Sequence, residues 1–316
     1  AALAPAAAAA AAPGGGGPGG TASAVAAAAA PVGSAATAGC APEDVKLYIF
    51  GYGSLMMRTS AVKTNCNITD VTPYTLQSLL DYFKNDRKVR RCIRAQPTFI
   101  PVEAAGISRG WYAHGKLQSQ EILNWSTDQM MGQYLDIAPT YLGAVNQTGE
   151  RSTGVIYPVT EAELKATDER ETGSAGARYT KEWLQPEDVK VLAANSTVNL
   201  TCAKIRWYAM AWEDIKIPDA QFPINQYYVD LFVGGALELE RENNISGFAL
   251  LSVMLTSAWS THWINDRIVA YRPYEKNYLA TDITRVLLRA TQTPGSPLTM
   301  DQLRQIKLVG APGTQD

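Results

Sequence analysis

Residues Ile49–Leu55 read IFGYGSL, in which an apolar strand signal runs directly into a turn that carries two glycines. The residues from Val45 to Phe50 are mostly aliphatic or aromatic, and this composition favours a strand. Gly51 and Gly53 allow a tight turn, and consecutive backbone N–H groups in such a turn can bind a carboxylate or an oxyanion. The motif is short, and taken alone it is more typical of an ordinary turn that ends a strand.

The turn does not match the glycine motifs of other catalytic and nucleotide-binding loops. It lacks the Gly-Lys-Ser/Thr of a P-loop and the third glycine of a dinucleotide-binding loop. Ser54 lacks the glycine order of a nucleophile elbow, so we do not expect it to be acylated. The two histidines, His114 and His262, are expected to be structural, and no His, Cys and carboxylate cluster has metal-ligand spacing. The sequence therefore predicts no metal site.

A capped helix is predicted from Thr160 to about Glu171. Thr160 and Glu163 form a Thr-x-x-Glu capping box, which marks the start of a helix. Residues 164, 167, 168 and 171 then fall on one helical face, and Leu164 indicates that this face is buried.

Glu171 is the candidate catalytic residue on that helix. With Asp168 it is expected to point inward, whereas Glu169 and Arg170 are expected to point toward solvent. Desolvation raises the pKa of an inward carboxylate, which suits a general base that works near neutral pH. The alternative, a solvated glutamate on the last helical turn, fits the pattern equally well.

The remaining elements predict the fold class. Further strands are expected at residues 98–102, 110–117, 141–145, 154–159 and 200–212. Further helices are expected at residues 74–83, 225–239 and 245–263, with Gly234 and Gly235 interrupting the second, and a short one opened by Thr299 and Gln302. The rest of residues 58–98 reads as polar and irregular. Because strands and helices do not alternate regularly, we expect an α+β fold with a curved mixed or antiparallel sheet.

Charge and composition set the N-terminal segment apart from the rest of the chain. Residues 1–42 carry no charged side chain and consist mostly of Ala, Gly and Pro, so we expect a low-complexity tail that does not order itself. Prolines and a glycine run interrupt the roughly 20 apolar residues that a membrane span requires. The net charge of −2 is spread along the chain, and the basic cluster Lys84–Arg94 is more typical of a solvated face than of a nucleic-acid site. We expect neither a membrane span nor a nucleic-acid partner.

An excess of N-x-Ser/Thr triplets indicates the compartment, because such acceptors of N-glycosylation belong on secreted proteins. Six asparagines head a triplet: Asn67, Asn124, Asn146, Asn195, Asn199 and Asn244. The chain also begins with Ala, which fits the expectation that a signal peptide has been removed. We expect a secreted protein or one on the extracellular surface. The alternative is a cytosolic protein in which the triplets occur by chance.

The cysteines point to the same compartment. They are even in number and lie at Cys40, Cys66, Cys92 and Cys202. Four cysteines permit three pairings, of which we favour Cys66–Cys92, which would staple residues 58–98, together with Cys40–Cys202. In a cytosolic protein all four would be unpaired.

Together these motifs resemble the γ-glutamylcyclotransferase superfamily. IFGYGSL resembles its strand and substrate-binding turn, and TYLGAV (Thr140–Val145) with TGVIYPVTEAELKATDERE (Thr153–Glu171) resembles its strand–strand–helix block. Residues Pro223–Arg267 resemble a C-terminal helical extension found in some larger members. Thr167 stands where the family usually has Leu, and Lys181 where an Arg often follows the tyrosine that resembles Tyr179.

The resemblance implies a fold and a reaction. The fold would be a small mixed or antiparallel β-barrel with flanking helices and a C-terminal helical extension. The reaction would cyclise a γ-glutamyl group to 5-oxoproline and release an amine or peptide, with Glu171 as general acid and base and no cofactor. Substrate would bind to a small set of residues: Gly51, Tyr52, Gly53, Ser54, Leu55 and Tyr179.

The expected organisation has three parts: a tail at residues 1–42, a cyclotransferase-like domain at 43–290 and a C-terminal tail with a short helix at 291–316. The substrate would be a small γ-glutamyl peptide or amine. An alternative function is a secreted structural or self-assembling glycoprotein that reuses the fold. In that case the N-terminal tail would pack on a neighbouring copy and hold a homo-oligomer together.

Overall fold

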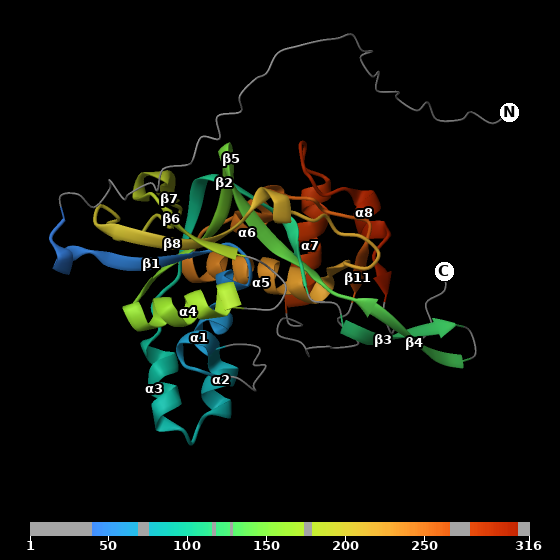
Figure 1. The fold of residues 1–316 in the computed structure, drawn as a ribbon, viewed down its shortest axis with the longest axis horizontal. Coiled ribbons are helices and arrows are strands. Elements are labelled where there is room, and N and C mark those ends of the chain that lie inside the picture. The colour runs from blue at the N-terminus through green and yellow to red at the C-terminus, as the bar shows by residue number, and fades with distance from the viewer. Residues whose placement is uncertain are drawn as a thin grey trace, which may run out of the picture. The chain divides into compact units, whose positions relative to one another are not determined.

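Strand β1 (Lys46–Gly51) lies inside a mixed sheet that dominates the fold (Figure 1). The computed structural model describes residues 40–68, 76–115, 118–126, 129–173, 179–265 and 279–308. β1 pairs antiparallel with β5 (Thr140–Val159) and parallel with β8 (Ala203–Met210). The strand predicted at residues 45–50 is confirmed, and it is flanked on both sides by other strands.

The alternation of side chains along β1 divides the core in two. Ile49 faces a core that the sheet shares with helices, whereas Tyr48 and Phe50 face a second core. The buried members of this second core come from strands β1, β2, β5, β6, β7 and β8 or from the turn after β1. The sheet therefore curves around its own side chains on one face and carries helices on the other.

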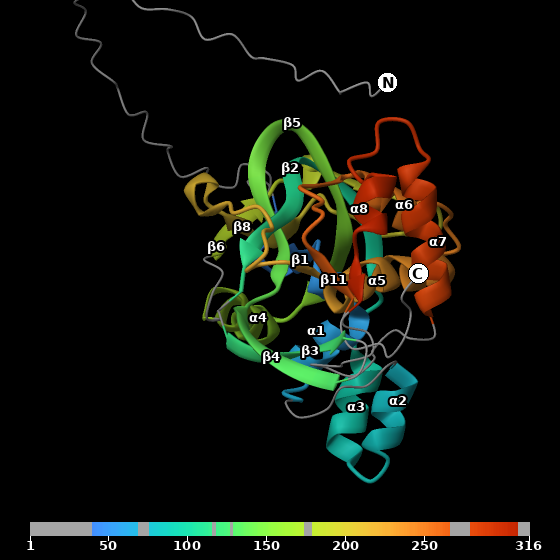
Figure 2. The ribbon, with the colours of Figure 1, turned by 90° about the vertical axis from the view of Figure 1, so that its right-hand side faces the viewer.

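β2 (Ile100–His114) and β5 form the longest ladder, from Ile100 opposite Ile156 to His114 opposite Thr140. Figure 2 shows them as two long curved ribbons side by side. The sequence predicted two short strands in place of each, and this was wrong. Gly106 and Gly149 have positive φ values of 76° and 88°, so the backbone bends there while the strands remain paired.

The remaining strands extend this sheet at its margins. They are β6 (Tyr179–Leu184), β7 (Val189–Val191), β9 (Ile224–Asn225), β10 (Thr256–Ser257), β11 (Trp263–Asn265) and β12 (Lys307–Leu308). A separate two-stranded sheet joins β3 (Gln118–Ser126) to β4 (Gln129–Ile137).

The expected closed barrel is not formed by the described residues, although the mixed α+β class is confirmed. Among these residues β7 pairs with β2 and β6 pairs with β8, and no ladder joins β7 to β8 or β6. The reason is local, because residues 192–202 between β7 and β8 form turns and irregular backbone rather than a strand.

The helices begin where the sequence supplies a cap or an apolar face. The described α-helices are α1 (Arg58–Asn65), α2 (Leu76–Tyr82), α3 (Arg87–Ala95), α4 (Glu161–Gly173), α5 (Gln226–Asn243), α6 (Phe248–Met254), α7 (Ala280–Thr291) and α8 (Met300–Arg304). The capping box predicted for α4 is present, since Glu163 N–H donates to Thr160 Oγ1 at 3.2 Å and Thr160 N–H to Glu163 Oε2 at 2.8 Å. A second box, between Thr299 and Gln302, opens α8 as expected. None of the described helices is long and apolar enough to cross a membrane.

Two predicted helices differ from the structure. α5 continues through Gly234 and Gly235, because Gly235 packs tightly on main chain and a Cβ there would lie 3.2 Å from Met56 O. The helix expected over residues 245–263 ends at Met254, and the following residues Thr256–Ser257 pair with β2 instead. The predicted helix did not allow for this ladder.

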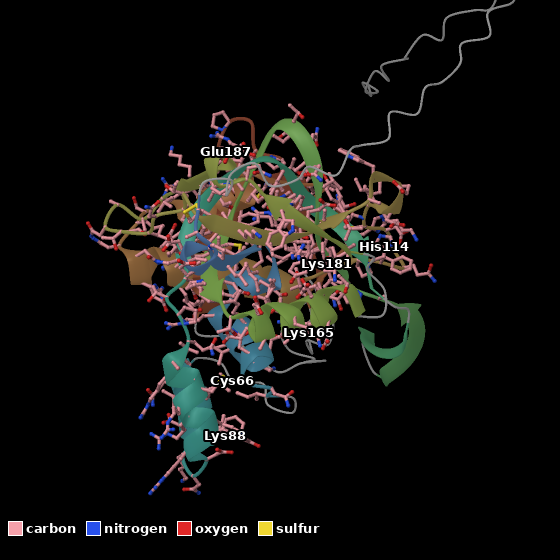
Figure 3. All side chains as sticks on the ribbon, turned by 60° about the vertical axis from the view of Figure 1, so that its left-hand side comes forward. Cys66, Lys88, His114, Lys165, Lys181 and Glu187 are labelled. Carbon is pink, nitrogen blue, oxygen red and sulfur yellow. A yellow bond between two sulfur atoms is a disulfide. The ribbon has the colours of Figure 1, made fainter. Side chains whose placement is uncertain are left out.

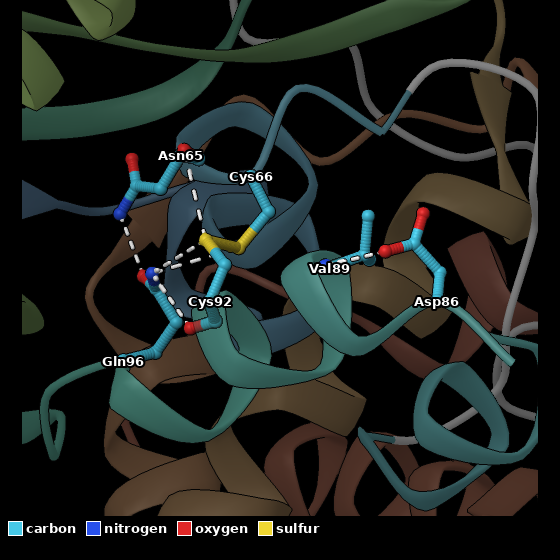
Figure 4. The surroundings of a disulfide bond; sticks show 6 residues. All are labelled: Asn65, Cys66, Asp86, Val89, Cys92 and Gln96. Atoms are coloured by element: carbon cyan, nitrogen blue, oxygen red, sulfur yellow. Dashed lines mark hydrogen bonds between the residues drawn. A yellow bond between two sulfur atoms is a disulfide. The ribbon is translucent and has the colours of Figure 1, made fainter. Parts of the chain in front are cut away.

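The described part of residues 58–98 contains three helices; the helix predicted at residues 74–83 is confirmed by α2, whereas the irregular backbone expected elsewhere gives way to α1 and α3. α1 to α3 share a small apolar core of Val62, Ile68, Leu79 and Ile93. The predicted disulfide Cys66–Cys92 joins the end of α1 to α3, and Gln96 Nε2 donates to Cys92 O at 3.4 Å beside it (Figure 4). The basic cluster lies mainly on α3, where Lys88 is exposed as expected for a solvated helix face (Figure 3).

The predicted Cys40–Cys202 disulfide is also present. It ties the start of the described chain to the residue that precedes β8, and Lys46 N–H donates to Cys202 O at 3.0 Å in the same place. Most of the predicted tail, residues 1–39, and the last part of the chain, residues 309–316, lie outside the described residues. The predicted domain boundaries therefore stay predictions.

A buried arginine connects the sheet to the helices. Arg109 of β2 is 1% exposed, and its guanidinium donates to Tyr52 O at 3.2 Å, Thr153 O at 2.6 Å and Ser252 O at 2.6 Å. It also lies over the Phe232 ring, 4.6 Å from the centroid. Burial lowers the pKa of Arg109 to about 9, so the side chain keeps its charge at neutral pH.

Replacing Arg109 with Leu is expected to destabilise the protein by about 3 kcal/mol, because three buried carbonyls lose a charged donor. The free energy of unfolding, measured by urea titration, tests this. Arg151→Leu is a matched control, since the Arg151 side chain is 57% exposed and its loss should cost no more than about 0.5 kcal/mol. Equal stability of the two variants would contradict the expectation.

Candidate functional site

The turn after β1 is held by side chains from distant parts of the chain. Tyr52 O accepts from Arg109, and the Tyr52 hydroxyl donates to Tyr208 O at 2.6 Å. Ser54 N–H donates to the hydroxyl of Tyr228, from α5, at 3.2 Å. A Cβ on Gly53 would lie 2.8 Å from that same hydroxyl, so glycine is needed for this approach. The turn is thereby fixed in one conformation, with Ser54 N–H directed at a polar oxygen.

Gly51 and Leu55 close the turn on themselves. A Cβ on Gly51 would lie 2.6 Å from Leu55 Cβ, so only glycine allows the chain to fold back this tightly. Leu55 starts the buried part of a short 3₁₀ helix, Ser54–Met56, and packs in the core shared with the helices. Gly51 and Leu55 therefore determine the shape of the turn, whereas Gly53 and Ser54 supply its polar groups.

Glu171 lies in the last turn of α4, and its side chain is 16% exposed. Its Oε1 lies 3.2 Å from Arg170 Nε but accepts no hydrogen bond from the described residues. Burial raises the pKa of the Glu171 carboxyl above its ordinary value, and the Arg170 guanidinium lowers it in part. The inward orientation expected from the helical pattern is present, and it leaves one carboxylate oxygen available.

The charge of Glu171 acts on several buried tyrosines. The charge of Glu171 contributes to raising the pKa of five of them, and burial is the larger cause in each: Tyr52, Tyr157, Tyr179, Tyr208 and Tyr228. All five are therefore neutral at physiological pH and can act as hydroxyl donors or acceptors. The predicted site residue Tyr179 is anchored to β5, because its hydroxyl donates to Leu142 O at 3.0 Å.

A second buried polar atom without a hydrogen-bond partner belongs to a tyrosine on which the charge of Glu171 acts. Tyr157 of β5 is 1% exposed, its ring stacks on Phe99 with centroids 4.3 Å apart, and its hydroxyl has no hydrogen-bond partner among the described residues. An unpaired buried hydroxyl or carboxylate oxygen costs on the order of 1–3 kcal/mol. Such an atom indicates a place where a polar ligand or water can bind.

The expectation that Arg170 points toward solvent was wrong. Its side chain is 31% exposed and donates to Thr64 Oγ1 at 2.6 Å, Ser60 Oγ at 3.0 Å and Ser54 Oγ at 3.3 Å. It therefore contacts both Glu171 and the glycine turn. Helical periodicity alone missed it because a long arginine side chain can reach sideways across its own helix face to another element.

The other residues of this helix face support α4. Asp168 accepts from the Tyr208 hydroxyl at 2.9 Å, with Arg206 and Lys181 nearby at 3.5 and 3.7 Å. Thr167 is 1% exposed, and its hydroxyl donates to Glu163 O at 2.9 Å. The hydroxyl that Thr167 carries in place of a leucine side chain is thus hydrogen-bonded within the helix.

Sequence reasoning missed Arg170, Tyr228, Tyr157 and Tyr208 as neighbours of Glu171. Tyr157 and Tyr208 lie in predicted strands, and Tyr228 lies in the first turn of a predicted helix. Which strand faces the end of α4 depends on sheet order, and no local pattern carries that information. The signal that the sequence did offer was a tyrosine hydroxyl on an otherwise apolar strand face.

The other predicted sites are placed as follows. Of the six triplet asparagines, five have described side chains and all five are exposed: Asn67, Asn146, Asn195, Asn199 and Asn244. The side chain of Asn124 lies outside the described residues. His114 stacks on Phe222 and its Nε2 lies 3.0 Å from Ile217 O, which fits the structural role expected for it. No group of His, Cys, Asp or Glu within the described ranges is arranged to hold a metal ion.

Comparison with solved structures finds remote similarities. A γ-glutamyl cyclotransferase aligns over 76% of this chain and 99% of its own, with 13% identity and a TM-score of 0.35. An uncharacterized protein from Homo sapiens aligns over 63% and 80%, with 13% identity and a TM-score of 0.31. A γ-glutamyl cyclotransferase specific to glutathione, from yeast, aligns over 66% and 95%, with 11% identity and a TM-score of 0.28.

No protein-family model matches the chain, and a comparison with curated proteins also finds no match. Because TM-scores this low do not establish a shared fold, function has to be inferred from the residues of the site.

Because Glu171 is buried, we expect its ionisation to lower the stability of the folded protein. Its pKa in the folded protein lies above the ordinary value of 4.5, so the unfolded chain releases this proton first as the pH rises. The folded state then loses stability through that interval. Glu171→Gln, which cannot ionise, is expected to have a higher melting midpoint than the wild type at pH 7. The difference should disappear at low pH, where Glu171 is protonated in both the folded and the unfolded protein.

Differential scanning fluorimetry between pH 3 and pH 8 measures this difference. Glu169→Gln is the control, because Glu169 is exposed on the same helix and its replacement should leave the midpoint unchanged. A lower midpoint for Glu171→Gln at pH 7 would show that the carboxylate is stabilised by its surroundings instead.

Proposed function

We propose that this protein is a γ-glutamylcyclotransferase in which Glu171 transfers the protons. The observation that carries the proposal is the buried Glu171 carboxylate, whose Oε1 accepts no hydrogen bond from the described residues and whose neighbour Arg170 donates to Ser54 of the glycine turn. The order of the sequence motifs supports the same family. A carboxylate of raised pKa with a free oxygen has the properties of a general base near neutral pH.

The reaction is intramolecular. The free α-amine of a γ-glutamyl substrate attacks its own γ-carbonyl carbon, so a new C–N bond closes the five-membered ring. Glu171 takes the proton from the attacking nitrogen and returns it to the nitrogen of the leaving amine as the original C–N bond breaks. The products are 5-oxoproline and the free amine or peptide, and no water or cofactor is consumed.

The turn and the tyrosines would provide binding and charge stabilisation. Backbone N–H groups from Tyr52 to Leu55 would hold the glutamyl carboxylate or the developing oxyanion. Among them, Ser54 N–H now donates to the Tyr228 hydroxyl, and the substrate oxygen would approach from that same side. Tyr179 would line the same pocket. Holding both ends of the glutamyl group keeps the amine near the carbonyl, which supplies much of the acceleration in a ring closure.

The proposal predicts that the protein releases 5-oxoproline from γ-glutamyl dipeptides or glutathione. Glu171→Gln is expected to reduce the rate by about 10²–10⁴-fold, because the proton acceptor is removed while the shape is kept. Glu169→Gln, its exposed neighbour, should retain the wild-type rate. Chromatography with mass detection of 5-oxoproline measures this. A folded wild type that turns over none of these substrates would reject the enzyme and favour the structural alternative.

We further propose that the protein is a secreted glycoprotein. The two disulfides and the exposure of five triplet asparagines support this. The side-chain oxygen of Asn199 accepts from Thr201 N–H at 2.9 Å and Thr201 Oγ1 at 2.7 Å, so the amide nitrogen is left for modification. The self-assembly alternative depends on residues 1–42, which lie almost entirely outside the described residues.

Secretion predicts a measurable glycan mass. Protein expressed in a secreting eukaryotic cell should lose mass on treatment with an N-glycosidase, and Asn199→Gln should remove the mass of a single glycan. Intact-mass spectrometry measures both. Thr201→Ser keeps an acceptor triplet and should keep the glycan, whereas Thr201→Ala should not. An unchanged mass after glycosidase treatment would remove the main support for secretion.

A further inference from the structure

The guanidinium of Arg170 uses each of its nitrogen atoms. Nη1 donates to Thr64 Oγ1 at 2.6 Å and Ser60 O at 3.3 Å, and Nη2 donates to Ser60 Oγ at 3.0 Å and Ser54 Oγ at 3.3 Å. Nε lies 3.2 Å from Glu171 Oε1. One side chain therefore joins three elements: α1, the glycine turn and the last turn of α4.

The anchoring of Arg170 comes from α1 rather than from Glu171. All four of its hydrogen bonds go to hydroxyl or main-chain oxygens, whereas the contact with Glu171 Oε1 lacks hydrogen-bond geometry. The positive charge is consequently held beside the carboxylate without occupying its lone pairs. Glu171 Oε1 stays free to accept a proton from a bound molecule.

The geometry points to Arg170 as a positioning residue that holds the Glu171 carboxylate and the Ser54 turn in register with each other. This inference rests on the proposed cyclotransferase function and adds to it a determinant outside the substrate-binding turn. A planar fork with several donors is required, because a lysine ammonium is a single point and cannot contact Ser60, Thr64 and Ser54 together. Arg170 itself need not contact substrate.

The groups that face Glu171 set the direction of its pH dependence. The five tyrosines on which its charge acts have raised pKa values and stay neutral. Asp168, on the same helix, is paired with Lys181 and Arg206 and bonded to Tyr208. Arg170 is the cation that lowers the pKa of Glu171, so its removal raises that pKa further.

Arg170→Gln and Arg170→Lys separate charge from geometry. With Gln, the acidic limb of the kcat/KM profile should move to higher pH, and activity on that limb should fall by about tenfold for each pH unit of the move, because less of Glu171 is ionised. With Lys, the charge returns, so the limb should move back toward the wild type while KM stays raised because the Ser54 contact is missing. Arg151→Gln, an exposed control, should match the wild type throughout.

The double variant Ser60→Ala with Thr64→Val tests the anchoring from α1. It keeps both charges but removes two side-chain acceptors of Arg170, so KM should rise while the limb shifts less than in Arg170→Gln. A wild-type profile in Arg170→Gln would overturn the inference. So would a fall in melting midpoint in all Arg170 variants with KM and the pH profile unchanged, since that describes a purely structural role.

A titration without substrate distinguishes failure of this inference from failure of the proposed function. The side-chain carboxyl carbon of Glu171, in protein labelled with ¹³C-glutamate and assigned by its absence in Glu171→Gln, reports its ionisation directly by NMR. A higher titration midpoint in Arg170→Gln supports the positioning role even if the wild type releases no 5-oxoproline. An unchanged midpoint in an active enzyme rejects the role and leaves the cyclotransferase intact.

Discussion

The buried guanidinium of Arg109 is the interaction on which the rest of the fold depends. It is held by carbonyls of the glycine turn, of β5 and of α6, together with the hydroxyls of Thr153 and Thr256. No carboxylate is bonded to it among the described residues, so the desolvation of its charge is offset by dipoles and by the ring of Phe232. Because these partners come from separate parts of the chain, the charge is satisfied only when sheet and helices are assembled together.

The same interaction determines the geometry of the candidate site. Arg109 fixes the carbonyl of Tyr52, and the next residues then turn so that Ser54 N–H meets Tyr228 and Ser54 Oγ meets Arg170. A rigid turn is what an oxyanion or carboxylate site needs, since donors placed in advance need no reorganisation during reaction. The two arginines thus have different tasks: Arg109 fixes the main chain of the turn, and Arg170 relates the turn to Glu171.

Local patterns predicted the parts of the fold that depend on local interactions. The capping boxes at Thr160 and Thr299, strand β1 and the start of α5 were predicted correctly. Both disulfide pairings were also predicted correctly, although Cys40 and Cys202 lie 162 residues apart in the sequence. What failed depends on partners distant in sequence. The continuity of β2 and β5, the early end of α6 at Met254 and the open sheet are all decided by which strands pair, and hydrophobic periodicity does not record pairing.

The site shows the same division, and here it bears on function. Glu171 could be placed inward from its helical phase, but the cost of that burial is visible only from its surroundings. A carboxylate with a raised pKa and an unbonded oxygen weakens the folded state at neutral pH. The same two properties suit the general base proposed for Glu171. Among the described residues the buried hydroxyl of Tyr157 likewise lacks a hydrogen-bond partner, and a polar ligand or water bound there would offset that cost.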